Sequence, residues 1–169
     1  MSKLKILVVD DFPIFRVGLG ALLSKTANLE IIGEAENGQV AIEKARQLEP
    51  HLILMDLMMP VMGGTEAIRI IKKHQPEIKI IALTAENQLK QIQATLAAGA
   101  DGYVLKDDSN LSLLTAIDTI KNDRIYLSPG ICNAVLSGSA GDSEHIRSAV
   151  SWCRLYEKEQ EEIAHIVKD

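Results

Sequence analysis

Several short apolar runs of this sequence end on a polar side chain, and these side chains together suit phosphoryl chemistry. The residues concerned are Asp10, Asp11, Asp56, Thr84 and Lys106. Three carboxylates held close together repel one another and resist ionisation. Mg²⁺ resolves that conflict, because it accepts one or two carboxylates and leaves positions for phosphate oxygens. A lysine adds positive charge and a threonine a hydroxyl donor, so the set predicts phosphoryl transfer to a carboxylate.

The spacing of the acids divides their roles. Asp10 and Asp11 are adjacent and suit metal binding, whereas Asp56 stands alone and suits the nucleophile. Each residue has a simpler interpretation by itself: an aspartate after a strand commonly caps the next helix, a threonine can be a turn hydroxyl, and a lysine a solvated charge. Their occurrence together at several strand ends favours a site.

The apolar runs alternate with helical periodicities through roughly the first 122 residues. Strands are predicted over 4–9, 29–35, 52–55, 78–83 and 102–105, and helices from Pro13 and over 40–48, 67–71, 89–98 and 110–120. Strands that are apolar on both faces and alternate with helices indicate a parallel sheet covered on both sides. We therefore expect an α/β fold with a doubly wound five-stranded parallel sheet, flavodoxin-like with order 2-1-3-4-5, and a C-terminal helical extension. In such a fold the carboxyl ends of the strands meet at one edge, which brings the polar residues together.

Several motifs in order resemble the receiver domains of two-component response regulators, over roughly residues 4–122. They are Ile6-Leu7-Val8-Val9-Asp10-Asp11, Leu54-Met55-Asp56-Leu57-Met58-Met59-Pro60 with Gly63-Gly64, Ala82-Leu83-Thr84-Ala85, and Gly99-Ala100-Asp101-Gly102-Tyr103-Val104-Leu105-Lys106. The resemblance implies a phosphoacceptor signalling domain and not an enzyme, with self-catalysed phosphorylation and slow autodephosphorylation. Its partner would be a sensor histidine kinase.

The resemblance also implies how the acids share the work. Asp56 would accept the phosphoryl group from the phosphohistidine of the kinase. Asp11 would bind Mg²⁺ directly and Asp10 largely through water, and the backbone carbonyl of Met58 would complete the ligands that the protein supplies.

Three further residues take their roles from the same resemblance. Thr84 and Lys106 would hold the phosphoryl oxygens. Tyr103 matches the switch aromatic, which turns inward when Thr84 moves toward the phosphate; an aromatic ring that simply packs on the fifth strand is the alternative. The signal would pass through the fourth helix, the fifth strand and the fifth helix as a population shift between two states.

Past the sheet, residues 124–129 narrow the resemblance to the NarL/FixJ subfamily, in which a receiver precedes a LuxR-type helix-turn-helix. We predict a receiver domain over 1–125, a short helix and a flexible linker over 126–142, and a C-terminal helix over 143–169. The last helix resembles the start of the helix-turn-helix, but Tyr156 replaces a capping residue and Glu162 an apolar one. No recognition helix follows, so we expect no specific DNA binding, whether the chain is a fragment of a transcription factor or a naturally short regulator.

The C-terminal helix carries a broken apolar stripe. Its members are Ile146, Val150, Cys153, Tyr156, Ile163 and Val167. Two interpretations stay open: packing against the rest of the chain, or a surface for a partner or for a homodimer.

Composition limits the remaining classes of function. The net charge is -5, aromatic residues are only 4%, and no basic run is present, so nucleic-acid binding is not expected. The apolar run near the N-terminus is too short for a signal peptide or a membrane span, which predicts a cytoplasmic protein without a membrane partner. Cys132 and Cys153 form neither a disulfide framework nor a metal quartet, and we expect reduced thiols.

Other functions fit less well. Metal-dependent phosphatases that use a strand-end aspartate are typified by an Asp-x-Asp pattern on the first strand, whereas the two acids here are adjacent. A nucleotide-binding doubly wound protein would need a glycine-rich turn where Asp10-Asp11-Phe12-Pro13 stands. A binding module that works without phosphorylation remains an alternative.

Overall fold

The computed structural model describes residues 2–108, 110–137 and 144–168. Its centre is a six-stranded parallel sheet with strand order β2-β1-β3-β4-β5-β6. The strands are β1 (Leu4–Val9), β2 (Leu29–Ala35), β3 (Leu52–Asp56), β4 (Lys79–Thr84), β5 (Gly102–Leu105) and β6 (Tyr126–Leu127). The helices described are α1 (Pro13–Ser24), α2 (Gly38–Leu48), α3 (Gly64–His74), α4 (Leu89–Ala97), α5 (Asn110–Lys121), α6 (Pro129–Ser137) and α7 (Glu144–Lys168).

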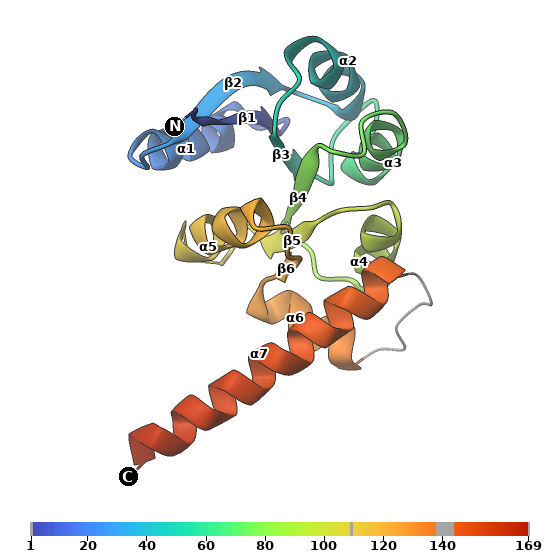
Figure 1. The fold of residues 1–169 in the computed structure, drawn as a ribbon. Coiled ribbons are helices and arrows are strands. Elements are labelled where there is room, and N and C mark those ends of the chain that lie inside the picture. Colours follow the sequence, from blue (N-terminus) through green and yellow to red (C-terminus); the bar gives the residue numbers. More distant parts are fainter. Residues whose placement is uncertain (1, 109, 138–143, 169) are drawn as a thin grey trace.

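Successive side chains along the strands point to opposite faces of the sheet and pack into two separate hydrophobic cores. Leu7 and Ile53 belong to the core shared with α2, α3 and α4. Ile6 and Leu54, their neighbours in sequence, belong to the core shared with α1 and α5. Figure 1 shows these two groups of helices on opposite sides of the sheet. The predicted doubly wound fold is therefore confirmed, and the order 2-1-3-4-5 lies within the observed sheet.

The prediction of five strands is one strand short. Tyr126 and Leu127 pair in parallel with Gly102 and Tyr103 and extend the sheet beyond β5. Two residues are too few to show a periodicity, so this strand is defined by its neighbour and not by its own sequence. The sheet thus continues into the segment predicted as a short helix and linker. Of the segment over 126–142 that was predicted as a short helix and a flexible linker, residues 138–142 lie outside the described residues.

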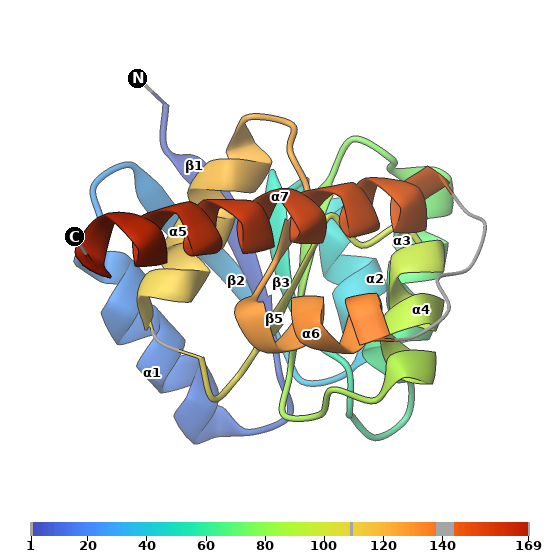
Figure 2. The same cartoon turned by 90° about the horizontal axis from the view of Figure 1, so that it is seen from below.

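The described parts of the C-terminal extension pack against the sheet and its helices. Ile131 of α6 and Ile146 and Ala149 of α7 are buried in the same core as β1 and β3. The first half of α7 contacts α4, α6 and β6, and Figure 2 shows it lying across this side of the molecule. The interpretation of this helix as one that packs on its own chain therefore holds for its first half.

The second half of α7 has a different environment. All the residues from 157 to 166 are exposed, and Figure 1 shows the helix running clear of the rest of the protein. Ile163 and Ile166 present apolar side chains to solvent there, 54% and 75% exposed, and Leu155, just before this stretch, is 61% exposed. None of the described helices, α7 included, is long and apolar enough to cross a membrane.

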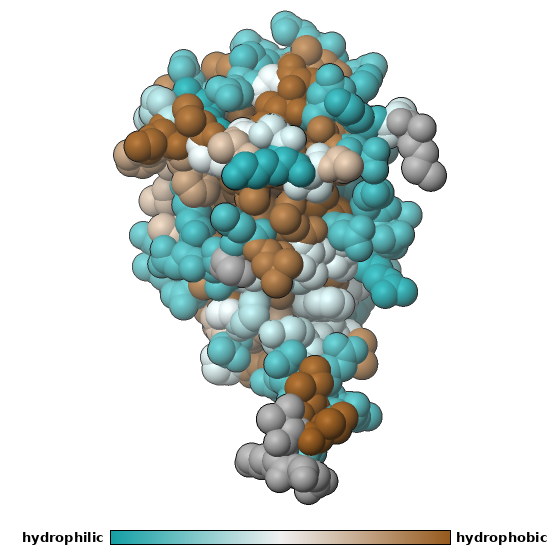
Figure 3. Space-filling view, turned by 90° about the vertical axis from the view of Figure 1, so that its left-hand side faces the viewer, coloured by the Kyte–Doolittle hydropathy of each residue, from teal (hydrophilic) through white to brown (hydrophobic). Residues whose placement is uncertain are grey.

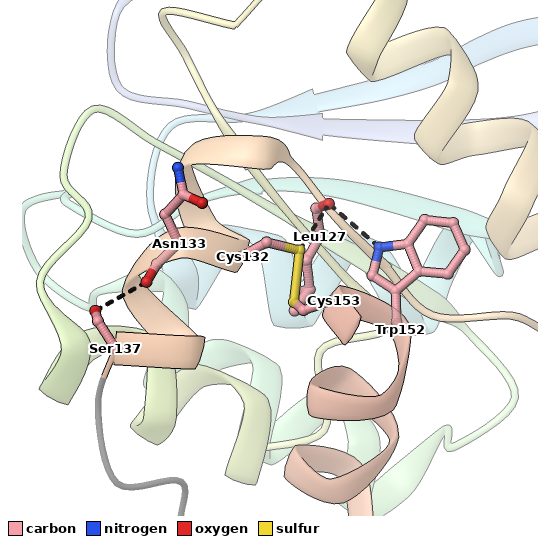
Figure 4. Close-up of a disulfide and its surroundings, with 6 residues drawn as sticks. All are labelled: Leu127, Cys132, Asn133, Ser137, Trp152 and Cys153. Atoms are coloured by element: carbon pink, nitrogen blue, oxygen red, sulfur yellow. Dashed lines mark hydrogen bonds between the residues drawn. A yellow bond between two sulfur atoms is a disulfide. The ribbon is translucent and has the colours of Figure 1, made fainter. Parts of the chain in front are cut away.

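A disulfide joins Cys132 of α6 to Cys153 of α7, so the expectation of reduced thiols is wrong. Both residues are buried, and their Cα atoms lie 5.2 Å apart, within the range that a disulfide spans. Beside the bond, the indole N–H of Trp152 donates to the Leu127 carbonyl at 3.4 Å (Figure 4). Two cysteines separated by 21 residues meet only because the helices pack, and their spacing alone does not indicate that contact.

Candidate functional site

The carboxyl ends of β1, β3, β4 and β5 lie at one edge of the sheet, as expected for this fold. They carry the residues selected from the sequence: Asp10 and Asp11 after β1, Asp56 and Thr84 at the ends of β3 and β4, and Lys106 after β5. Asp10, Asp56 and Thr84 are at most 4% exposed. Strand register brings them together, since Asp56 pairs with Leu83, the neighbour of Thr84.

The three aspartates form a compact acidic cluster. One oxygen from each of Asp10, Asp11 and Asp56 lies within 4.8 Å of the other two. Oδ1 of Asp11 is buried and has no hydrogen-bond partner among the described residues. Buried acceptors rarely stay unpaired, and a bound cation would satisfy this one. Three carboxylate oxygens are the donors that a hard divalent cation accepts, so the residues fit such an ion.

The surroundings of Asp56 disfavour its ionised form. Burial, followed by the like charge of Asp10, raises the pKa of Asp56 from an ordinary 3.8 to about 6. The ammonium of Lys106 and the backbone N–H of Met58, which lies 3.3 Å from Oδ1, act in the opposite direction. A carboxyl group shifted this far by burial and by specific neighbouring charges is typical of functional sites.

Lys106 supplies the positive charge at the cluster. Its Nζ lies 2.7 Å from Oδ2 of Asp10 and 3.5 Å from Oδ2 of Asp56. Its backbone N–H donates to the carbonyl of Thr84 at 2.7 Å, which fixes the end of β5 against the end of β4. The ammonium therefore lies between two strand-end carboxylates.

The residues expected to form the switch lie on β4 and β5. Oγ1 of Thr84 accepts a hydrogen bond from the Glu86 N–H at 3.2 Å, which leaves the hydroxyl hydrogen to donate elsewhere. The ring of Tyr103 is fully buried, and its hydroxyl has no hydrogen-bond partner among the described residues. Burial, and then the charge of Glu86, raise the pKa of Tyr103. The tyrosine ring is thus buried, and its role as a switch stays a prediction.

The turn after β3 brings the start of α3 into close contact with the backbone at the end of this strand. The Gly64 N–H donates to the Leu57 carbonyl at 3.0 Å, and a Cβ on Gly64 would lie only 2.9 Å from the Leu57 Cα. Glycine therefore allows α3 to begin directly against the end of β3. The Met58 side chain is 56% exposed while its N–H faces Asp56, and the role of its carbonyl as a metal ligand stays a prediction.

Two residues of α1 contact the site and were not selected from the sequence. Nη1 of Arg16 donates to the Asp10 carbonyl at 2.6 Å, and its Nε pairs with Glu34 at 3.1 Å. The Lys106 Nζ lies 4.3 Å from the centroid of the Phe15 ring. Their place soon after Asp10-Asp11 is a weak signal, because which side of α1 faces the site depends on how the helix packs.

Comparison with known proteins identifies the family of this chain. The sequence model of the response regulator receiver domain matches residues 6–118. The chain belongs to this family. It is 38% identical over 134 residues to the transcriptional regulatory protein LnrK of Bacillus subtilis, and 42% identical over 114 residues to the response regulator protein VraR of Staphylococcus aureus. Receiver domains are signalling domains and not classical enzymes.

Solved structures give the same fold. A LuxR-family response regulator from Aurantimonas sp. SI85-9A1 has a TM-score of 0.77 at 31% identity, covering 80% of this chain and 97% of that one. RcsB of Salmonella typhimurium has a TM-score of 0.74 at 26% identity, covering 79% of this chain and 66% of RcsB. The matches to LnrK and VraR cover 79% and 68% of this chain but only 61% and 54% of those proteins. This chain therefore matches LnrK and VraR over only part of the length of those two proteins.

Proposed function

We propose that this receiver is the phosphoacceptor switch of a two-component phosphorelay, with Asp56 accepting a phosphoryl group from a sensor histidine kinase. One observation carries the proposal. Asp56 ends the central strand β3 in a buried position, with two further carboxylates and one ammonium around it. That set is suited to receiving a phosphoryl group, because positioning and charge neutralisation do most of the work in such a transfer.

A Mg²⁺ ion would be held by the carboxylates of Asp10, Asp11 and Asp56 and by the backbone carbonyl of Met58. Two observations support this assignment: Oδ1 of Asp11 is buried and finds no hydrogen-bond partner among the residues described, and all the donors are oxygens. When bound, the ion offsets the charge of the three carboxylates and binds phosphoryl oxygens.

The transfer itself uses the side chain of Asp56. A carboxylate oxygen attacks phosphorus, a new O–P bond forms, and the N–P bond to the kinase histidine breaks, so that the imidazole leaves with the electron pair and takes a proton from solvent. The Lys106 ammonium and the Thr84 hydroxyl hold the phosphoryl oxygens. Hydrolysis of the product is slow, since the domain is a switch and not a turnover catalyst.

Thr84 and Tyr103 would report phosphorylation to the surface. Movement of Thr84 toward the phosphoryl group favours the inward ring of Tyr103, and the balance between two states of α4, β5 and α5 shifts. Support comes from the buried ring and from its hydroxyl, which has no hydrogen-bond partner in the part of the chain that the structure describes.

The output that we propose is regulation of transcription in the cytoplasm through a homodimer or another protein. Support comes from LnrK, which is named as a transcriptional regulatory protein. The exposed apolar side chains on the second half of α7 offer a dimer surface (Figure 3, lower end). Residues 144–168 form one continuous helix and not a helix pair, so we propose no specific DNA contact by this part of the chain.

Intact mass spectrometry after incubation with acetyl phosphate tests the proposal. The wild type should gain one phosphate only when Mg²⁺ is present, and Asp56→Asn should gain none. Asp118→Asn, which removes an exposed aspartate of α5, serves as the matched control and should behave as the wild type. Retained labelling of Asp56→Asn would overturn the acceptor assignment. No labelling of the wild type would instead indicate a binding module that works without phosphorylation.

A further inference from the structure

Among the described residues, the ammonium of Lys106 has three charged or aromatic neighbours, and one of them is not an acid. Two are the carboxylates of Asp10 and Asp56, at 2.7 Å and 3.5 Å. The third is the ring of Phe15 on α1, whose centroid lies 4.3 Å from Nζ. A cation within about 6 Å of a ring centroid is attracted by the negative face of the ring.

These three neighbours differ in whether they stay available to Lys106 when a metal ion binds and when Asp56 is phosphorylated. Asp10 and Asp56 are also members of the acidic cluster, so a divalent cation would compete with Lys106 for the charge of these carboxylates. Phosphorylation would further convert the Asp56 carboxylate into an acyl phosphate, whose negative charge lies on the phosphoryl oxygens. The ring of Phe15 has no lone pair for a metal and no role toward a phosphoryl group. It is thus the neighbour of Lys106 that neither event takes away.

We propose that Phe15 is a positioning residue: its ring face keeps the ammonium of Lys106 at the end of β5, ready for the incoming phosphoryl group, once the acids are engaged. The inference rests on the proposed phosphorylation of Asp56. Phe15 does not touch the reacting atoms and acts only through Lys106.

The location of Phe15 allows the idea to be tested without disrupting the fold. The ring is only half-buried, and it lines a groove of about 430 Å³ between α1 and α5 together with Leu19, Leu83 and Leu113. Figure 3 shows the face of the protein that carries α1 and α5, with apolar side chains gathered over it. A larger ring at position 15 has room to extend into this groove, and a leucine still fills the space beside the core.

The first experiment compares rates of phosphorylation by acetyl phosphate at saturating Mg²⁺. Phe15→Leu should slow the reaction roughly 2- to 30-fold, the range that corresponds to a cation–π contact. Phe15→Tyr, which keeps a ring with a negative face, should restore most of the rate. The Mg²⁺ dissociation constant, measured by calorimetry, should stay that of the wild type in both variants.

The chain contains only two phenylalanines, which provides a matched control. Phe12→Leu makes the same substitution at a side chain that is 61% exposed, and its rate should equal that of the wild type. A wild-type rate for Phe15→Leu, or an equally slow rate for Phe15→Tyr, would overturn the proposal, because the ring would then have no role or only fill space.

A second experiment does not depend on phosphorylation and so separates the two proposals. Urea unfolding is followed by circular dichroism for the wild type, Phe15→Leu, Lys106→Met and the double variant. Lys106→Met keeps the length of the side chain and removes its charge. Phe15→Leu should therefore lower the unfolding free energy more in the wild-type background than in the Lys106→Met background. Equal losses in both backgrounds would refute the ring–ammonium contact. A wild type that takes up no phosphate but shows this coupling would refute only the phosphoacceptor function.

Discussion

Asp56→Asn should stabilise the receiver in the absence of metal, and the gain should grow as the pH rises. Because the folded-state pKa of Asp56 is about 6 and its ordinary value is 3.8, the folded protein binds this proton more tightly than the unfolded chain does. The resulting stability is fully present below pH 3.8 and is lost as the pH rises through 6. Asparagine is neutral throughout and does not suffer this loss.

The size of the stabilisation by Asp56→Asn follows from the difference between the folded-state pKa of Asp56 and its ordinary value. A difference of about two pKa units corresponds to at most about 3 kcal/mol of unfolding free energy. Solvent near the strand end screens part of it, so we expect a gain of about 1–3 kcal/mol above pH 7 and little gain near pH 4. Asparagine keeps an oxygen to accept from the Met58 N–H, so the turn should persist.

Urea unfolding in the presence of a chelator, at several values between pH 4 and pH 8, measures the gain. The single tryptophan, Trp152, packs against Tyr126 with a ring-centroid distance of 5.8 Å and reports unfolding by its fluorescence. Asp123→Asn is the control, because a hydrogen bond and the charge of Lys79 lower the pKa of this exposed carboxyl group. It should not be stabilised as the pH rises.

Two outcomes would refute the reasoning. A gain of constant size from pH 4 to pH 8 would show that Asp56→Asn acts through packing and not through charge. A loss of stability at pH 8 would show that the attraction of Lys106 exceeds the cost of burial and of the neighbouring acids. Excess Mg²⁺ should reduce the gain, because the cation stabilises the ionised wild type.

Three further changes test other parts of the structure. Asp11→Ala should weaken Mg²⁺ binding by about tenfold or more in calorimetry, since it removes a proposed ligand, and an unchanged affinity would exclude Asp11 from the site. Cys132→Ser should lower the unfolding free energy by about 3 kcal/mol in urea without reductant, because the disulfide closes a loop with a sequence separation of 21; equal stability would contradict that bond. Ile163→Asp should keep phosphorylation but halve the mass of any phosphorylated dimer in light scattering, and a dimer of unchanged mass would exclude this part of α7.

Most of the sheet was predictable because its strands carry strong local signals. Apart from Lys5 near the start of β1, the runs that became β1 and β3 are apolar, as expected of strands buried on both faces, and each run is closed by an aspartate. Parallel strands bring their carboxyl ends to one edge, so the proximity of Asp10, Asp11 and Asp56 followed from topology alone. Their chemical roles remain predictions.

What could not be predicted depends on contacts between segments that are distant in sequence. Tyr126 and Leu127 become a strand only because β5 offers a free edge. Cys132 meets Cys153 only because α7 packs on α6. In each case the local sequence is compatible with several structures, and the neighbouring element selects one.

By itself, the sequence determined the fold class and the types of side chain at the strand ends, because periodicity and residue chemistry are local properties. Only the tertiary structure decided the environment of those side chains. It buried Asp56 beside Asp10, which raises the pKa of Asp56, and it turned the ring of Phe15 toward Lys106. Burial and electrostatic interaction depend on distances in space, and packing sets these distances.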